Sequence, residues 1–192
     1  MSQMKEKIKE VAVEYFHKKS YFATGVNDLA LASGIRKASI YHHYPSKEEI
    51  LFDILKTTMA DLEVNLERSQ KGLSGAEEKL RAAIRSHVLF HLLRQKEVII
   101  SDSELRALSV ENYKIIVKMR DRYEREFQTL LGQGQAEGIF APGDVKVLSY
   151  AVLTMCTAVA TWFKSSGRLA MEEIARIYEN FIMNGLKHGA IG

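Results

Sequence analysis

Apolar residues recur every three or four positions along most of this chain, the spacing that places side chains on one face of an α-helix. The first such stripe lies in residues 4–19 and contains Ile8, Val11, Ala12, Tyr15 and Phe16. The same pattern predicts helices over residues 47–70, 76–95, 97–108, 110–136 and 171–188, and one that begins after Asp144 and ends near residues 165–167. No stretch of useful length alternates as a β-strand does, so the sequence predicts an all-α protein.

Two short apolar stripes flank a lone glycine in the N-terminal part of the chain. Leu29 precedes Gly34, and Ile35 and Ile40 follow it. Gly34 suits a left-handed turn, because a Cβ there would cost energy. This spacing lets a second short helix pack across the first, which predicts a helix-turn-helix.

The exposed face of the second of these helices carries hydrogen-bond donors at Lys37, Ser39, Tyr41 and His42. Such side chains reach phosphates or base edges in a DNA major groove. Residues 17–47 also hold five Lys or Arg residues against a single Asp. A basic face by itself is as compatible with a solvated surface as with a polyanion-binding one. Together with the helix-turn-helix pattern, it predicts double-stranded DNA as a partner.

The first fifty residues resemble the DNA-binding domain of TetR-type transcriptional regulators. The resemblance rests on TGVNDLA (24–30) and GIRKASIYHHYPSKEEIL (34–51), in which the positions in register are Gly34, Tyr41, His43, Ser46, Lys47 and Glu48. Four positions depart from the family pattern. Ala38 replaces a frequent Gly, and Tyr44 replaces a frequent Phe. Arg36 replaces a Ser or Thr that often caps the helix after the turn, and Ser20 replaces a Gly that often ends the first helix.

The resemblance implies a helix-turn-helix domain over residues 1–46 and a helical effector-binding and dimerisation domain over residues 47–192. Thr24 is expected to cap the helix before the turn, and Ser46 the helix that starts at residue 47. Thr24 and Lys47 are expected to hold phosphates. The expected DNA-binding residues are Thr24, Arg36, Lys37, Ala38, Ser39, Tyr41, His42 and Lys47.

Residues 147–163 are apolar on nearly all sides, which a membrane span would also be. The run is at the short limit for spanning and is interrupted by Ser149, Thr154, Thr157 and Thr161. We therefore predict no membrane contact and expect the run to pack on its own domain and on a second subunit. In the resembling family the last two helices form a dimer bundle, which implies a homodimer on a palindromic operator.

Polar groups lie on otherwise apolar stripes in the middle of the chain. His87 and His91 are four residues apart, a spacing that suits a metal, but no third ligand is evident and we predict none. Arg120 shares a stripe with Tyr123 and other aromatic residues. It needs either an internal acid such as Glu104 or an anionic ligand, because an unpaired buried charge is costly.

Residues 101–140 and 161–186 also resemble the subset of the family that senses acyl-CoA thioesters. That similarity implies a small-molecule effector, with an acyl-CoA as the candidate. The residues placed by stripe position as ligand-binding candidates are His87, Phe90, His91, Leu105, Arg106, Tyr113, Met119, Arg120, Tyr123 and Trp162.

These observations predict a dimeric repressor that a small-molecule effector releases from DNA. The alternative is a DNA-binding regulator or architectural protein without an effector. No Ser/His/acid arrangement, phosphate loop or metal motif stands out, so we predict no enzyme activity, no cofactor and no catalytic residue. Cys156 is the single cysteine, which fits a reducing cytoplasm, and it lies in an apolar run where a thiol is usually inert.

Overall fold

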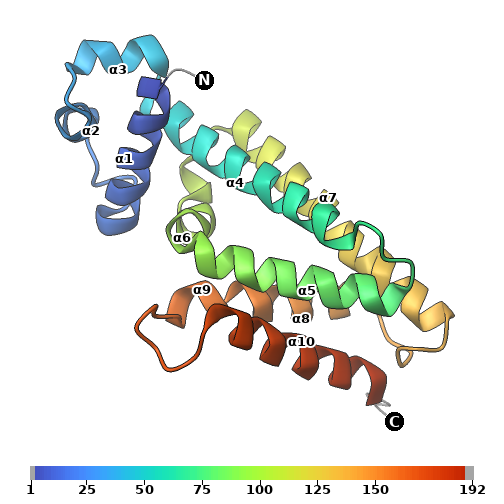
Figure 1. The fold of residues 1–192 in the computed structure, drawn as a ribbon. Coiled ribbons are helices and arrows are strands. Elements are labelled where there is room, and N and C mark those ends of the chain that lie inside the picture. The colour runs from blue at the N-terminus through green and yellow to red at the C-terminus, as the bar shows by residue number, and fades with distance from the viewer. Residues whose placement is uncertain (1–2, 189–192) are drawn as a thin grey trace. The chain divides into compact units, whose positions relative to one another are not determined.

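The computed structural model describes residues 3–188, and between these residues every regular element is helical, which confirms the all-α prediction (Figure 1). In chain order the elements are α1 (Gln3–Lys19), α2 (Val26–Ser33), α3 (Lys37–His43), α4 (Lys47–Gln70), α5 (Ala76–Leu93), α6 (Gln95–Ser103), the 3-10 turn η1 (Leu105–Ala107), α7 (Val110–Ala136), α8 (Val145–Thr157), α9 (Val159–Trp162) and α10 (Met171–His188).

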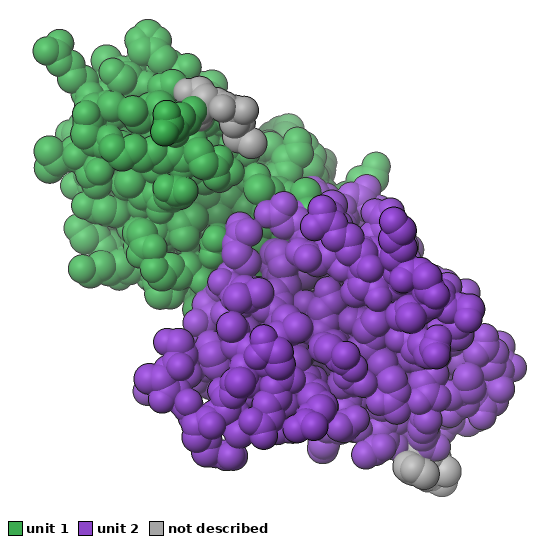
Figure 2. All heavy atoms as spheres, in the orientation of Figure 1, with its two compact units in different colours: residues 1–60, 96–118 green, residues 61–95, 119–192 purple. Residues whose placement is uncertain are grey.

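The contacts within the chain divide it into two compact units, which are coloured separately in Figure 2. Unit 1 comprises residues 1–60 and 96–118, and unit 2 comprises residues 61–95 and 119–192. Helices α4 and α7 each contribute to both units. The domain boundary between residues 46 and 47 stays a prediction.

In unit 1, α1 packs against α2 and α3. The predicted stripe of α1 is the buried one: Ile8, Ala12 and Phe16 are at most 2% exposed. They share the core of this unit with fully buried side chains of the other elements, among them Leu29, Ile40, Ile50, Leu51, Ile54 and Leu55. Burial of this apolar set fixes α2 and α3 on the rest of the unit.

In unit 2, α5 is the central helix and packs against α8, α9 and α10 (Figure 1). Glu179 of α10 is buried and accepts hydrogen bonds from Arg85 Nε at 2.9 Å and from Arg81 Nη1 at 3.1 Å, both on α5. At the far end of α10, Lys187 Nζ lies 2.7 Å from the carboxylate of Glu77. These ion pairs, with apolar packing, fix the rotation of α10 on α5.

Two predicted helices are each interrupted. The helix expected over residues 97–108 ends at Ser103, because the carboxylate of the buried Glu104 turns inward to accept the Tyr21 N–H at 3.2 Å. The helix expected to run from Asp144 to residues 165–167 breaks at Ala158. Its predicted cap is confirmed, since Asp144 accepts from the N–H groups of Lys146 and Val147.

Candidate functional site

The turn between α2 and α3 has the predicted left-handed glycine. Gly34 has φ 74° and ψ 29°, its N–H donates to the Leu31 carbonyl at 3.1 Å, and the Ile35 N–H donates to the Ala30 carbonyl at 3.0 Å. Ile40 is fully buried and holds α3 against the core of unit 1. The geometry is that of a helix-turn-helix, in which the second helix is presented on its outer face.

The outer face of α3 carries the predicted donors. Lys37, Tyr41 and His42 are exposed, Arg36 is exposed at the helix N-cap position, and Ser39 is half-buried. Ala38, also exposed, is a small residue on this face. Among residues 3–188, the structure assigns no hydrogen bond or ion pair to the side chains of Arg36, Lys37, Tyr41 or His42. This face can therefore donate to phosphates and base edges without losing internal bonds.

Thr24 is not the N-cap of α2, so that prediction is wrong. Gly25 occupies the cap position, and its N–H donates to Asp28 Oδ2 at 3.0 Å. The Thr24 side chain is buried, and its hydroxyl donates to the carbonyl of Ser20 at 2.8 Å. Ser20 has φ 70°, which explains why the family pattern prefers glycine there. The Thr24 hydroxyl thus closes the α1–α2 connection.

Lys47 also has an internal role. Its ammonium donates to the carbonyls of Tyr21 and Thr24, both at 2.8 Å, and lies 4.1 Å from the centre of the Tyr21 ring. Desolvation lowers the pKa of Lys47, although the charge of Glu104 opposes that shift. Lys47 therefore ties the start of α4 to the α1–α2 connection, and a phosphate contact from it stays a prediction. Ser46 caps α4 as predicted, accepting the Glu49 N–H at 3.1 Å.

Unit 2 contains a buried polar cluster in an otherwise apolar interior. His87 Nδ1 lies 2.9 Å from the Tyr123 hydroxyl, and His87 Nε2 lies 3.1 Å from the Thr157 hydroxyl. His91 stacks on His87, with 3.9 Å between ring centres, and its Nδ1 lies 2.8 Å from the His87 carbonyl. A carbonyl only accepts, so His91 carries a proton on Nδ1.

Burial keeps His87, Tyr123 and the nearby Cys156 neutral. It lowers the pKa of His87 well below 6.5, a shift to which a charge on His91 would add. Burial likewise raises the pKa of Tyr123 well above 10.0 and that of the nearby Cys156 thiol to about 12. His87, Tyr123 and Thr157 are therefore neutral donors and acceptors, which suit a carbonyl or hydroxyl group better than a charge. Within residues 3–188, no three His, Cys, Asp or Glu side chains gather as a metal site would require.

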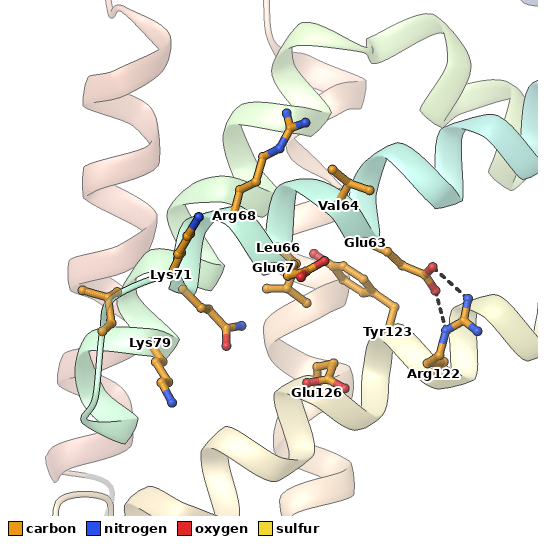
Figure 3. A pocket seen from close by; sticks show the side chains of 12 residues that line it. Glu63, Val64, Leu66, Glu67, Arg68, Lys71, Lys79, Arg122, Tyr123 and Glu126 are labelled. Atoms are coloured by element: carbon orange, nitrogen blue, oxygen red, sulfur yellow. Dashed lines mark hydrogen bonds and ion pairs between the residues drawn. The ribbon is translucent and has the colours of Figure 1, made fainter.

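Two hollows open on unit 2. One, of about 750 Å³, lies at the end of α4 and reaches Tyr123 (Figure 3). Its lining is mixed in charge, and Figure 3 shows Arg122 paired with Glu63 at one side, with Arg122 Nη2 2.8 Å from Glu63 Oε2. The other, of about 640 Å³, lies between α4 and α5 and reaches Phe90.

The structure brings together four of the ten predicted ligand residues. His87, His91, Phe90 and Tyr123 lie in one cluster, with the Phe90 and His91 ring centres 5.9 Å apart. Met119 and Arg120 are half-buried on α7, and Trp162 is 51% exposed, stacked on Tyr178. The remaining candidates belong to unit 1 and are Leu105, Arg106 and Tyr113.

Sequence reasoning misses Thr157, which holds the buried histidine pair, and the arginines of the second hollow. In the sequence Thr157 is only an interruption of an apolar run. A hydroxyl inside such a run needs a partner when it is buried, and that requirement is the signal that could have found it.

Helices α8 and α10 each carry exposed apolar side chains. Val147 and Tyr150 on α8 are 63% and 50% exposed, and Ile177 and Phe181 on α10 are 49% and 69% exposed. Residues Val145–Trp162 are long and apolar enough to cross a membrane by length and composition, and 28% of that window is buried. Large apolar side chains exposed on both helices indicate an interaction site.

Both parts of the chain match known families. A family model described as "Bacterial regulatory proteins, tetR family" matches residues 8–54, and one described as "Tetracyclin repressor-like, C-terminal domain" matches residues 74–186. The HTH-type transcriptional repressor KstR2 of Mycolicibacterium smegmatis is 26% identical over 95% of this chain and 90% of its own length.

Solved structures agree with this match. The TetR family transcriptional regulator PfmR from Thermus thermophilus is 34% identical, covers 94% of this chain and 99% of its own, and has a TM-score of 0.86. AibR, crystallised with isovaleryl coenzyme A and operator DNA, is 30% identical, covers 93% of this chain and 97% of its own, and also has a TM-score of 0.86. The chain therefore belongs to the TetR family of bacterial regulatory proteins.

Proposed function

We propose that the protein is a homodimeric transcriptional repressor that acyl-CoA thioesters release from a palindromic operator. The observation that carries the DNA-binding part is the outer face of α3. It presents exposed donors on a helix that Ile40 anchors, immediately after the left-handed turn at Gly34. A helix held in this way enters the major groove of DNA.

In this proposal the residues of α3 divide the work. Tyr41, His42 and Lys37 face base edges and phosphates. Arg36 reaches a phosphate from the N-cap position, where the hydroxyl of a Ser or Thr would instead accept a hydrogen bond from a backbone N–H of the helix. Ser39, half-buried, adds a short-range donor, and Ala38 allows close approach. Thr24 and Lys47 hold the α1–α2 connection, and their phosphate contacts stay predictions.

The exposed apolar faces of α8 and α10 would bury each other across a two-fold axis. Covering Val147, Tyr150, Ile177 and Phe181 removes large apolar side chains from water, which favours association. A two-fold dimer reads a palindrome when its recognition helices lie about 34–36 Å apart. A repressor of this kind acts in the cytoplasm, where its DNA is.

The acyl-CoA class is supported by AibR, whose structure holds isovaleryl coenzyme A together with operator DNA. The buried hydrogen-bonding groups of His87, Tyr123 and Thr157 suit the thioester carbonyl, and the apolar residues around them suit an acyl chain. An effector shifts the protein off DNA only if it binds the DNA-incompetent state more tightly. A coupling of about 1–3 kcal/mol, or about 5–150-fold in affinity, is typical.

The test begins with an operator selected from random duplex DNA and measured by fluorescence anisotropy. Acyl-CoAs of increasing chain length are then added to the complex. We expect at least one to lower operator affinity by about 10-fold or more. Operator binding that no acyl-CoA alters, with no acyl-CoA raising the melting temperature, would favour the regulator without an effector.

We also propose binding without turnover. The Cys156 thiol is buried and its pKa is raised to about 12, so it is a poor nucleophile at neutral pH. After prolonged incubation with excess protein, the acyl-CoA recovered by chromatography should be intact. Release of free coenzyme A at a rate proportional to protein concentration would contradict this.

A further inference from the structure

The smaller hollow in unit 2 differs from the larger one in charge. Its lining includes Arg85 from α5, Arg94 directly after α5, and Arg68 from α4, which lines the edge of both hollows. No carboxylate among the described residues lines the smaller hollow. The lining of the larger hollow includes the carboxylates of Glu67 and Glu126 beside its Lys and Arg side chains. Carboxylates repel phosphates, so the smaller hollow, called here the arginine groove, is the better site for a polyanion.

The floor of the arginine groove is apolar. Leu89, Phe90 and Leu93 line it, and Leu93 is 65% exposed. Arginine beside an apolar strip suits a ligand that has both phosphates and a flat ring, because a guanidinium binds phosphate through two parallel N–H groups and the strip accepts the ring. Adenine nucleotides have this combination.

The guanidinium of Arg68 has N–H donors that can bind a ligand. The structure assigns its side chain no hydrogen bond or ion pair with any residue from 3 to 188. Figure 3 shows its guanidinium directed away from Glu67 and Glu126. Arg85 uses Nε and Nη2 on Glu179, so that carboxylate holds its guanidinium at the groove while Nη1 is not used in that pair.

The groove also adjoins the buried polar cluster. Phe90 lines the groove, and its ring centre lies 5.9 Å from that of His91, which stacks on His87. A ligand with phosphates on the arginines and a long arm over Phe90 would bring the end of that arm to the histidines. Coenzyme A thioesters have this shape, with a nucleotide at one end and the thioester at the other.

We propose that the arginine groove binds the phosphate-bearing nucleotide of the acyl-CoA effector. The inference rests on the proposed acyl-CoA response and adds to it the place of the nucleotide. Arg68 binds phosphate directly, Arg85 and Arg94 surround it, and the strip of Leu89, Phe90 and Leu93 contacts the adenine ring.

The test compares the full-length protein with Arg68→Glu and with a control, Arg125→Glu, at an exposed position of α7 that lines neither hollow. Calorimetry measures binding of an acyl-CoA, of the matching acyl-pantetheine, which has no phosphate, and of ATP. We expect Arg68→Glu to weaken acyl-CoA binding by about 10-fold or more and to leave acyl-pantetheine binding unchanged. Arg125→Glu should change neither.

The outcomes separate this inference from the proposed function. If acyl-CoA releases wild-type protein from its operator but Arg68→Glu binds acyl-CoA as tightly as wild type, the groove assignment is wrong and the function stands. If wild type binds ATP but no acyl-CoA, and Arg68→Glu loses ATP, the groove is a site for free nucleotides and the effector class is wrong. If neither probe binds wild type, both are wrong. Operator affinity, measured for each variant, shows that the fold is intact.

Discussion

The hydroxyl of Tyr123, on α7, lies 2.9 Å from Nδ1 of His87, on α5, and both side chains are buried. The opposite nitrogen of the same ring meets Thr157 of α8 at 3.1 Å. One imidazole therefore joins three helices of unit 2 through side-chain hydrogen bonds. Such a bond contributes modestly when it is made and costs more when one partner is left alone.

Tyr123→Phe should destabilise the protein by about 1–3 kcal/mol, because it leaves Nδ1 of His87 buried without its partner. The free energy of unfolding in urea measures the effect. Tyr113→Phe is the control, because Tyr113 is 43% exposed and the substitution should hardly change the free energy of unfolding. Equal stability of the two variants would mean that a buried water replaces the hydroxyl.

Stability should fall as the pH drops below the ordinary histidine value of 6.5. Burial lowers the pKa of His87 in the folded state, so the unfolded chain takes up a proton first. The loss begins near 6.5 and approaches about 1.4 kcal/mol per pH unit for this one group. Thermal melts from about pH 8 to about pH 5 check this.

His87→Gln supplies the comparison for the pH series. Glutamine does not titrate, so the unfolding free energy of the variant should vary less with pH than that of wild type over the same range. The absolute stability of the variant should be lower. Parallel curves for the two proteins would assign the pH dependence to other groups.

Tyr41→Ala should abolish specific operator binding and leave the dimer intact, because Tyr41 is 45% exposed on the outer face of α3 and its side chain has no assigned hydrogen bond within residues 3–188. We expect the variant to bind operator and scrambled duplexes with similar affinity, as measured by anisotropy. Tyr113→Ala, with similar exposure in the same unit, should bind like wild type. Retained operator affinity in Tyr41→Ala would remove this residue from the interface.

Phe181→Glu should convert the dimer to a monomer and weaken operator binding with it. Phe181 is 69% exposed on α10, and a charge there would have to be buried in the proposed interface. Sedimentation velocity measures the mass. Val110→Glu, at a residue 63% exposed in unit 1, should remain dimeric. A dimeric Phe181→Glu variant would place the interface elsewhere.

Lys47→Met should lower stability by about 1–3 kcal/mol, because two carbonyls lose a charged donor at 2.8 Å. The salt dependence of operator binding then separates the two roles of Lys47. A purely internal role leaves the slope unchanged, whereas loss of a phosphate contact lowers its magnitude by about 1. Lys37→Ala, on the outer face of α3, is the reference for a phosphate contact.

The sequence alone determined most of the helices, the turn at Gly34 and the outer face of α3, because each depends on local spacing. The determinants are apolar residues every three or four positions, one residue without a Cβ, and donors on the side opposite Ile40. The cap of α4 at Ser46 and that of α8 at Asp144 followed for the same reason, since a cap bonds only to the next few backbone N–H groups.

Tertiary structure decided whatever depends on residues far apart in the chain. Local sequence predicts Thr24 as a helix cap, but packing buries it and Gly25 takes that position. Glu104 ends α6 early because it reaches Tyr21, 83 residues away in sequence. The pairing of His87 with Thr157, and the meeting of Arg68 with Arg94 at one groove, likewise required the helices to be placed in space, since periodicity gives the buried face of a helix but not its neighbour.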